Sequence, residues 1–528
     1  MSLVRNFATV GGATMVSRVL GFLRDLMLAA AVGTGPVADA FVVAFRLPNL
    51  FRRLFAEGAF NSAFVPLFGR AVEEEGEAGA RKFAGEIGSA LLFCLLILTA
   101  LAQVFMPFVV WALAPGFVAD PQKYDLTVLM ARIAFPYLIF MSLLAFIGGI
   151  LNTYQRFAAA AFAPVMLNVV MCLVLGGVLF WGVRDNLILG VMLTLGVAVG
   201  GVVQLAVVVI DLKRLGFFIP VFRPRYTKSA KRLLVLGIPG VIAGGVTQIN
   251  IVVGQIIASM QDGANALLYY ADRLYQLPLG VIGIAIGVVL LPSLTRQLRS
   301  GQEDQYRRSL NNALEFSLVL TLPAAVALAV LPHELVSVLF ERGRFDGEAV
   351  NGTAAALAAF AFGLPAFVLN KVFSPGYFAR EDTKTPMIFA AIAMVVNVTL
   401  SIALFPVFKH VGIAIATTLA GWVNTALLIV VLQRRGHFTP DGRSVRKSGL
   451  ILLASVLMGV VVHFAAGALG PYLSDGWLVV RVLALCALIA LGMLTFAVFA
   501  QFTGGSDLIG HAKALKTRNT ASGNADLP

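Results

Sequence analysis

The sequence contains about fourteen stretches of roughly 20 mainly apolar residues, each long enough to cross a lipid bilayer as a helix. The predicted spans are 7–32, 37–66, 84–113, 125–151, 159–182, 187–211, 233–259, 264–295, 309–331, 350–378, 386–406, 411–433, 448–469 and 477–502. Charged residues make up only 13% of the 528 residues, about half of the share in a soluble protein. The chain is therefore predicted to be an all-α polytopic membrane protein.

The loops between these spans alternate in their content of basic residues. Several Lys and Arg residues occupy 212–232, 296–308 and 434–447, whereas loops such as 332–347 carry few. Because basic loops stay on the cytoplasmic side, we expect the first set and both chain termini in the cytoplasm. The net charge of +13 is then a topological signal and does not indicate nucleic-acid binding. The polar tail at 506–528 is expected to be disordered.

The chain also repeats itself in parallel. Two sets of four residues share one order at an offset of 226 or 227 positions: Ala38, Arg46, Pro66, Arg70 and Ala264, Arg273, Pro292, Arg296. Pro136 and Asn168 have the spacing of Pro365 and Asn397, and Gly201 and Gln204 have that of Gly421 and Asn424. We predict two six-helix lobes, residues 1–215 and 216–436, followed by two extra helices within 437–505. Parallel repeats support alternating access around a site between the lobes.

No catalytic or metal-binding pattern is found in the sequence. His333-Glu334 begins like a zinc-protease motif, but the second histidine is missing because residue 337 is Ser. The three cysteines each stand alone in an apolar stretch, without metal or disulfide spacing. We therefore expect a transporter and not an enzyme, with no cofactor and no metal.

Ten charged residues lie inside the first, second and eighth predicted spans: Arg18, Arg24, Asp25, Asp39, Arg46, Arg52, Arg53, Glu57, Asp272 and Arg273. A charge at the membrane centre costs at least about 2.5–3.5 kcal/mol on insertion scales, so these side chains should face a wet cavity or a partner. Snorkelling stays open for Arg46 but explains Arg52 poorly, since Arg52 lies roughly 22 Å along its span.

Some of these charges are expected to pair with one another: Asp39 with an arginine of the first span, and Arg53 with Glu57. Six of the ten are positive, so the predicted cavity is net cationic. Arginine binds phosphate bidentately, and the cavity therefore favours an anionic, phosphate-bearing ligand. Gly21, between Arg18 and Arg24, either bends its helix or packs against a neighbouring one.

Several motifs around these charges are distinctive. They are SRVLGFLRD at 17–25, ADAF at 38–41, RLPN at 46–49, RRLFAEGAF at 52–60, YADRLYQLP at 270–278 and LFERGRF at 339–345. With these motifs the chain resembles the MurJ (MviN) family of lipid II flippases, within the MOP exporter superfamily. The resemblance covers nearly the whole chain.

The resemblance implies a two-lobed bundle that moves lipid II, an undecaprenyl-pyrophosphate-linked peptidoglycan precursor, across the bacterial cytoplasmic membrane. The functional arginines that it implies are Arg18, Arg24, Arg52 and Arg273, with Asp39 as an acidic partner. Together with the charges inside the spans, the predicted substrate-binding set is Arg18, Arg24, Asp39, Arg52, Arg53 and Arg273, and the predicted supporting charges are Asp25, Arg46, Glu57 and Asp272. The extra helices would form a groove for the undecaprenyl chain. The expected partners are lipid II and membrane lipids, and the expected oligomeric state is a monomer.

Two other functions stay open at this stage. One is a flippase for another undecaprenyl-linked glycan, which the first-span motif argues against. The other is a cation-coupled drug exporter, which normally has twelve helices and a less basic cavity. The energy source is open as well, because Gln276 stands where some relatives carry an acidic residue.

The topology can be tested with single cysteines placed at Lys228 and Arg344 in a chain that lacks its three native cysteines. We expect a membrane-impermeant thiol reagent to label the two positions from opposite sides of the membrane, because the positive-inside rule places their loops on opposite sides. Labelling of both from one side would contradict the arrangement of fourteen spans.

Overall fold

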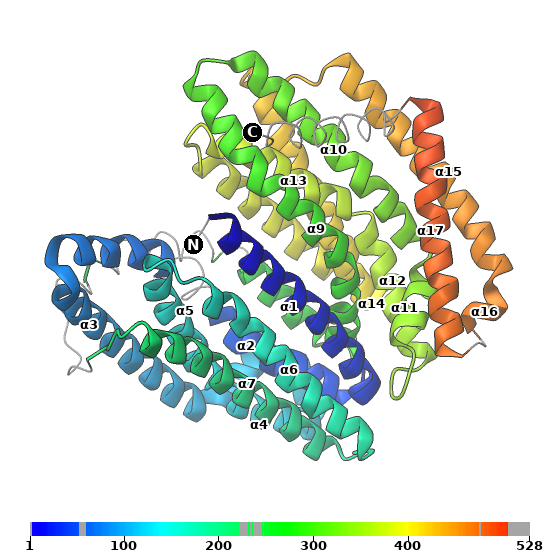
Figure 1. The fold of residues 1–528 in the computed structure, drawn as a ribbon. Coiled ribbons are helices and arrows are strands. Elements are labelled where there is room, and N and C mark those ends of the chain that lie inside the picture. Colours follow the sequence, from blue (N-terminus) through cyan, green and yellow to red (C-terminus); the bar gives the residue numbers. More distant parts are fainter. Residues whose placement is uncertain are drawn as a thin grey trace, which may run out of the picture. The chain divides into compact units, whose positions relative to one another are not determined.

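The computed structural model describes residues 3–51, 60–220, 231–232, 235, 245, 248–474 and 477–504, and every regular element in these ranges is a helix (Figure 1). Within them, nine helical segments are long and apolar enough to cross a membrane, and one of the nine, Lys384–Arg434, covers two predicted spans. The all-α polytopic fold class is thus confirmed. The predicted span 233–259 falls mostly outside the described residues.

The chain forms two compact units. Unit 1 comprises Met1–Tyr269 and Arg342–Asp346, and unit 2 comprises Tyr270–Glu341 and Gly347–Pro528. The predicted lobe boundaries at 215/216 and 436/437 stay predictions.

Unit 1 is a helical bundle in which α6 lies between α1 and α7 (Figure 1). Its helices are α1 (Leu3–Val32), α2 (Pro36–Phe51), α3 (Phe60–Leu113), α4 (Pro121–Ala134), α5 (Tyr137–Thr153), α6 (Ala158–Phe180) and α7 (Asn186–Arg214), with the 3-10 turn η2 (Pro115–Ala119). Small residues allow the close packing, as is usual between helices in lipid. A Cβ atom on Gly200 of α7, for example, would lie 2.5 Å from the Leu167 side chain of α6.

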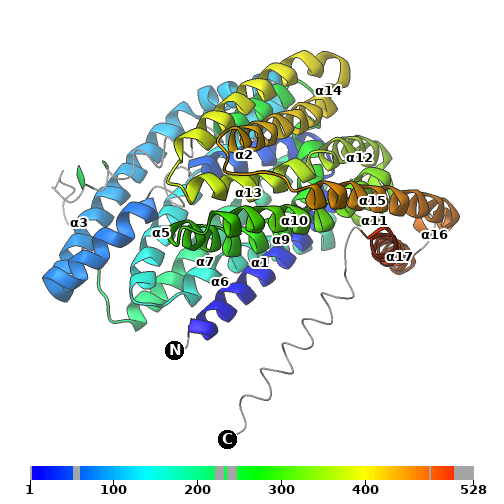
Figure 2. The same cartoon turned by 90° about the horizontal axis from the view of Figure 1, so that it is seen from above.

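Unit 2 contains most of α9 (Ala264–Arg299) and all later helices. These are α10 (Glu303–Val330), α11 (Pro332–Phe340), α12 (Gly347–Ala361), α13 (Leu364–Phe378), α14 (Lys384–Arg434), α15 (Gly442–Ala468), α16 (Gly470–Ser474) and α17 (Leu478–Thr503). Helix α15 packs against α10 on one side and α17 on the other, so that α17 lies at the edge of the unit (Figure 2). The two predicted extra helices correspond to α15 and α17.

Prolines divide two of the predicted spans. Span 125–151 forms α4 and α5, which meet at Pro136, and span 350–378 forms α12 and α13, which meet just before Pro365. Proline lacks the N–H that would continue the helix. The two breaks lie 229 positions apart (365 minus 136), at a pair of residues that the repeat had matched.

In two other places, helical segments from different predicted spans follow each other within one long helix, with a kink at a single residue between them. Spans 386–406 and 411–433 follow each other within α14 and are separated only by Lys409, whose φ is 53°. Likewise, Gly76, with a φ of 68°, separates the end of span 37–66 from span 84–113 within α3.

The repeat is also visible in the packing of the two units. A Cβ atom on Gly201 would lie 2.7 Å from Tyr137 of α5, and one on Gly421 would lie 2.7 Å from Phe367 of α13. The sequence repeat pairs these two glycines. In each unit an equivalent glycine thus lets a long helix, α7 or α14, pack closely against the helix that follows the proline break, α5 or α13.

A short segment between α11 and α12, Arg342–Asp346, belongs to unit 1, and we call it the strap. Arg344 N donates a hydrogen bond to Ala30 O at the end of α1, with an N–O distance of 3.0 Å. The Arg344 guanidinium donates to Asn186 Oδ1 at 3.2 Å and to the carbonyl oxygen of Arg184. The backbones approach so closely that a Cβ on Gly343 would lie 2.2 Å from Ala30 O, and one on Gly33 equally close to Arg344 O.

Replacing Gly343 by Ala should therefore destabilise the protein far more than replacing Gly182. Both glycines have nearly the same φ, +61° and +62°, but a Cβ on Gly182 meets nothing within 4 Å. We expect Gly182→Ala to cost about 1–2 kcal/mol of backbone strain, and Gly343→Ala roughly 3 kcal/mol or more because the strap must also move away from α1. Thermal unfolding of the purified variants in detergent measures the difference, and equal losses would show that the close approach is absent.

Candidate functional site

A cluster of polar side chains surrounds Arg24 inside unit 1, and we call Arg24, Asp25, Asn168 and Tyr269 the Arg24 cluster. The Arg24 side chain on α1 is only 12% exposed. Its Nη2 and Nε donate to Asp25 Oδ1 at 2.8 and 3.1 Å, and its Nη1 donates to Asn168 Oδ1 on α6 at 2.9 Å. The guanidinium is thus held on two sides, which fixes the direction of its remaining N–H groups.

The partners of Arg24 are themselves held in place. Asn168 Nδ2 donates to the backbone oxygen of Ser17 at 2.9 Å, and Tyr269 Oη donates to Asp25 Oδ1 at 2.8 Å. A Cβ on Gly21 would lie 3.5 Å from Asn168, and α1 runs through Gly21 without a break. Of the two readings of Gly21, the structure therefore shows helix packing and not a bend.

Arg18 lies two turns before Arg24 on the same helix and differs from it in environment. Its side chain is exposed and makes no hydrogen bond or ion pair with any of the described residues. Among the described residues, helix α1 therefore carries one arginine that is bound to protein groups, Arg24, and one that is not, Arg18.

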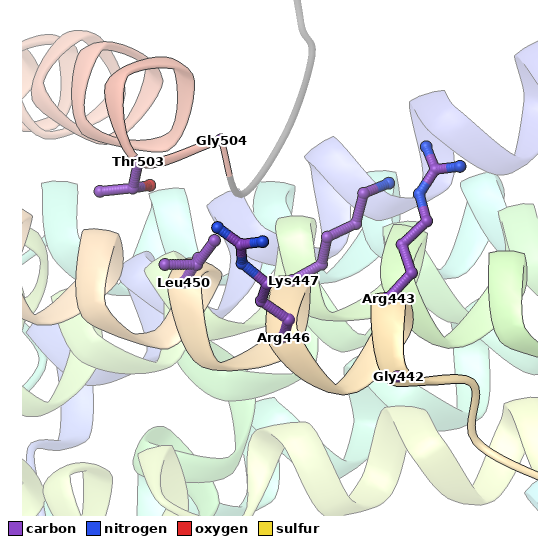
Figure 3. Close-up of a pocket in the computed structure, with 7 residues that line it drawn as sticks. All are labelled: Gly442, Arg443, Arg446, Lys447, Leu450, Thr503 and Gly504. Atoms are coloured by element: carbon purple, nitrogen blue, oxygen red, sulfur yellow. The ribbon is translucent and has the colours of Figure 1, made fainter.

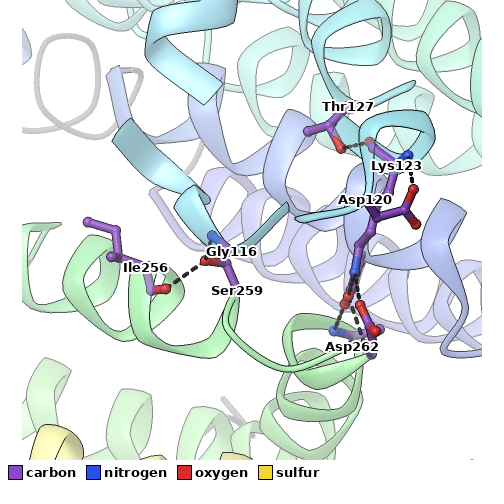
Figure 4. Close-up of polar contacts among 10 residues, drawn as sticks. Gly116, Asp120, Lys123, Thr127, Ile256, Ser259 and Asp262 are labelled. Atoms are coloured by element: carbon purple, nitrogen blue, oxygen red, sulfur yellow. Dashed lines mark hydrogen bonds and ion pairs between the residues drawn. The ribbon is translucent and has the colours of Figure 1, made fainter. Parts of the chain in front are cut away.

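Asp39 lies in a second polar cluster of unit 1, which we call the α9 anchor: Asp39, Lys123, Asp262, Gly263 and Ala266. Figure 4 shows its members Lys123 and Asp262. Asp39 is completely buried and accepts a bond from Lys123 Nζ at 2.7 Å. It also accepts from the backbone N–H groups of Gly263 and Ala266 at 2.8 and 3.0 Å. Lys123 reaches the exposed Asp262 at 3.1 Å, and its ammonium lies 4.2 Å from the Phe117 ring centroid.

The prediction that Asp39 pairs with an arginine of the first span is wrong. Asp39 lies in the first turn of α2, whereas Arg24 lies eight residues, or about 12 Å of helix, before the end of α1. The carboxylate instead satisfies N–H groups at the start of α9, where a helix has unpaired donors and a partial positive charge. Both of its oxygens are used inside unit 1.

A second contact holds the chain just before α9. Ser259 Oγ accepts a bond from Gly116 N at 3.1 Å and donates to Ile256 O at 2.7 Å (Figure 4). Position 116 requires glycine, because a Cβ there would lie 2.1 Å from Ser259 O. Together with the α9 anchor, this contact fixes the entry of α9 in unit 1, while the helix from Tyr270 onward belongs to unit 2.

The other predicted residues are distributed over both units or lie outside the described ranges. Arg46 on α2 and the pair Asp272 and Arg273 on α9 are half-buried, and Asp272 accepts a bond from Gln276 Nε2. Arg52, Arg53 and Glu57 lie outside the described residues. Among the described residues, no three His, Cys, Asp or Glu side chains are grouped to hold a metal ion.

Sequence reasoning missed an ion pair that attaches α17 to the rest of unit 2. Arg481 Nη2 donates to Glu341 Oε2 at 2.9 Å and to Ser337 Oγ at 2.7 Å, from a side chain only 14% exposed. Burial raises the pKa of the Glu341 carboxyl, but the hydrogen bonds from Ser337 and Arg481 lower it by more. The pKa of Glu341 therefore lies below its usual value. The available signal was that Arg481 is the one charge in an otherwise apolar span.

Sequence reasoning also missed Lys123 and Asn168 as partners of the predicted charges. Lys123 falls between the predicted spans 84–113 and 125–151, but Asp120 and Pro121 before it form a helix start: Asp120 caps α4 by accepting from Lys123 N at 3.2 Å. Asn168 is matched with Asn397 by the repeat, which gives no sign that its side chain binds Arg24.

The comparisons with known proteins cover almost the entire chain. The profile of the family described as "Lipid II flippase MurJ" matches residues 28–484. A "Probable lipid II flippase MurJ" of Rhizobium tropici is 48% identical over 523 residues, which cover 99% of this chain and 98% of that protein.

Solved structures give the same picture. "Lipid II flippase MurJ, inward closed conformation" matches with a TM-score of 0.77 and 26% identity, over 93% of this chain and 98% of that one. An inward-facing multidrug resistance MATE family transporter of the MOP superfamily matches with a TM-score of 0.59 at 15% identity, over 82% of this chain and 95% of that one. The second likeness concerns the fold alone.

Loss of Lys123 should destabilise unit 1, because it leaves the Asp39 carboxylate buried without its counter-charge. We expect Lys123→Met to cost about 3–5 kcal/mol in thermal unfolding. The double variant Lys123→Met/Asp39→Asn should recover part of that loss, since it removes the uncompensated charge. If the two single losses simply add in the double variant, Lys123 and Asp39 do not interact.

Proposed function

Because the chain belongs to the lipid II flippase MurJ family, we propose that it moves lipid II from the cytoplasmic to the periplasmic leaflet of the bacterial cytoplasmic membrane. It is a transporter, and it would work by alternating access in the service of peptidoglycan synthesis. The observation that carries this proposal is the match to the family over nearly the full length of the chain. We further propose a monomer with both termini in the cytoplasm.

The Arg24 cluster and Arg18 are proposed to bind the pyrophosphate of the substrate. Arg18 has free donors and would make the first contact, because no described carboxylate competes for it. Arg24 is already oriented by Asn168 and pairs with Asp25. Asp25 also accepts a hydrogen bond from Tyr269, so it would keep a partner if Arg24 turned toward a phosphate. A phosphate that shares Arg24 with Asp25 gains a pre-oriented guanidinium and avoids the entropy of ordering it.

Asp39 is proposed to act on the protein and not on the substrate. Its oxygens are occupied by Lys123 and by the first turn of α9, so it has little to offer an anionic ligand. Its role would be to hold the start of α9 in place. Arg52, Arg53 and Arg273 stay predicted substrate ligands, and Arg46, Glu57 and Asp272 stay predicted supporting charges.

The undecaprenyl chain is proposed to lie along α15 and α17. Both helices expose large apolar side chains over most of their length, among them Leu452, Val460 and Phe464 on α15 and Met493 and Phe502 on α17. The tether from Arg481 to Glu341 fixes one end of α17 against α11. A fixed apolar face can bind a long prenyl chain without first being ordered.

Alanine variants of Arg18, Arg24, Arg52 and Arg273 test the pyrophosphate ligands. Each should lose a charge-assisted bond worth roughly 1.5–3 kcal/mol, and therefore about tenfold to hundredfold in lipid II binding. Lysine at the same positions should rescue only in part, because it keeps the charge but not the bidentate fork. Binding and flipping are measured in proteoliposomes at equal protein content.

Arg299→Ala is the matched control, since Arg299 is exposed and has no partner among the described residues. It should bind and flip lipid II like the parent protein. If the Arg24, Arg52 and Arg273 variants flip at the parent rate, these arginines are structural and do not bind the pyrophosphate.

A further inference from the structure

A hollow of about 500 Å³ lies where the start of α15 meets the end of α17 in unit 2 (Figure 3). It is lined by Gly442, Arg443, Arg446, Lys447, Leu450, Thr503 and Gly504. The three basic side chains extend from α15 on the same side, as their spacing of three and four residues requires (Figure 3). The hollow is separate from the Arg24 cluster and from the α9 anchor, which belong to unit 1.

Two of the three cations are available to a ligand. Lys447 Nζ is paired with Glu315 Oε2 at 2.7 Å. Arg443 and Arg446 are exposed and make no hydrogen bond or ion pair with the described residues. The nearest acid on the same helix, Asp441, accepts from Ser444 N at 2.6 Å as the N-cap. Arg443, Arg446, Lys447, Glu315 and Asp441 together leave one net positive charge.

The residues that line the hollow also indicate which chemical groups the ligand does not need to have. Apart from the cations it contains one hydroxyl, on Thr503, and that hydroxyl already donates to Phe499 O at 2.8 Å. No Asn, Gln, Asp or Glu side chain lines the hollow to read sugar or peptide groups. Leu450 lines it on the side of the membrane-spanning part of α15, where apolar side chains such as Leu453 and Val456 are exposed.

We propose that this hollow binds the phosphate headgroup of an anionic glycerophospholipid, with its acyl chains entering the membrane beside Leu450, Leu453 and Val456 of α15. Guanidinium groups recognise phosphate by paired, charge-assisted hydrogen bonds. Basic clusters directly beside a membrane helix bind anionic lipids of the adjacent leaflet. Which leaflet supplies the lipid depends on the proposed cytoplasmic placement of residues 434–447. The chemistry of the site does not depend on that placement.

The chain's own tail is a poorer match for this hollow. Residues 505–528 carry Lys513, Lys516 and Arg518 against Asp507 and Asp526, so their side chains add positive charge and do not neutralise the arginines. An anionic lipid is present at high concentration in the membrane, so even a weak site would be occupied.

The test uses the full chain without its native cysteines, with Thr503→Cys carrying an environment-sensitive fluorophore in neutral detergent micelles. Titration with phosphatidylglycerol should change the fluorescence, whereas phosphatidylcholine and inorganic pyrophosphate should not. Arg443→Gln/Arg446→Gln should shift the midpoint about fivefold for each arginine and therefore about 25-fold in all. Arg299→Gln/Arg308→Gln removes the same charge from exposed positions of unit 2 that have no partner in the part of the chain that the structure describes, and it should leave the midpoint unchanged.

Three results would overturn the proposal. An unchanged midpoint in the Arg443→Gln/Arg446→Gln variant shows that these arginines do not bind the lipid. An equal response to inorganic pyrophosphate identifies a site for soluble anions. A response to lipid II but not to phosphatidylglycerol makes the hollow a substrate site. Lipid II flipping is measured in a separate assay. A negative phosphatidylglycerol titration therefore does not contradict the proposed function, and a negative flipping assay does not contradict this lipid site.

Discussion

The buried carboxylate of Asp39 determines where α9 begins. It brings together three parts of unit 1 that are far apart in sequence: the start of α2, the start of α4 through Lys123, and the residues before α9. A buried ion pair of this kind contributes little net stability compared with apolar packing, but losing one partner is costly. Its value is therefore in specifying one arrangement. Because α9 continues into unit 2, fixing its first turn defines how the chain leaves unit 1.

Two largely buried arginines, one in each unit, have the same kind of surroundings. Arg24 has Asp25 beside it, and Arg481 at the start of α17 has Glu341. Each arginine also has a neutral partner, Asn168 or Ser337, that supplies direction without adding charge. The cost of placing a cation in a lipid environment is thus offset locally. Arg18, by contrast, has no such partner among the described residues, which makes it the better candidate for a ligand contact.

Apolar length and periodicity were enough to predict the long helices among the described residues, because lipid requires every backbone group to be satisfied within a helix. The same signal did not show where a span divides, since a broken helix such as α4 and α5 is as apolar as a continuous one. Only Pro136 and Pro365 carried that information. The repeat identified both, yet did not assign them a role.

The candidate site was predictable in its residue types and less so in its pairings. Buried charges in the first two spans marked Arg24 and Asp39 as special, but their partners come from residues 144 and 84 positions away. Contacts at such distances depend on the tertiary fold, which a single sequence does not specify. Lys123 in particular lay among loop residues, where a lysine ordinarily signals topology.

The contact between the strap and α1 also has a genetic consequence. Gly343 faces the backbone oxygen of Ala30, and Gly33 faces that of Arg344, so in both cases the obstacle to a side chain is the main chain of the other segment. Truncating a neighbouring side chain makes no room against a main-chain atom. Second-site suppressors of a Gly343 or Gly33 substitution should therefore not arise at Ala30 or Arg344, and recovery of function would come by reversion. Each of these two glycines is thus required independently of the other, and we expect neither to covary with a residue of the facing segment.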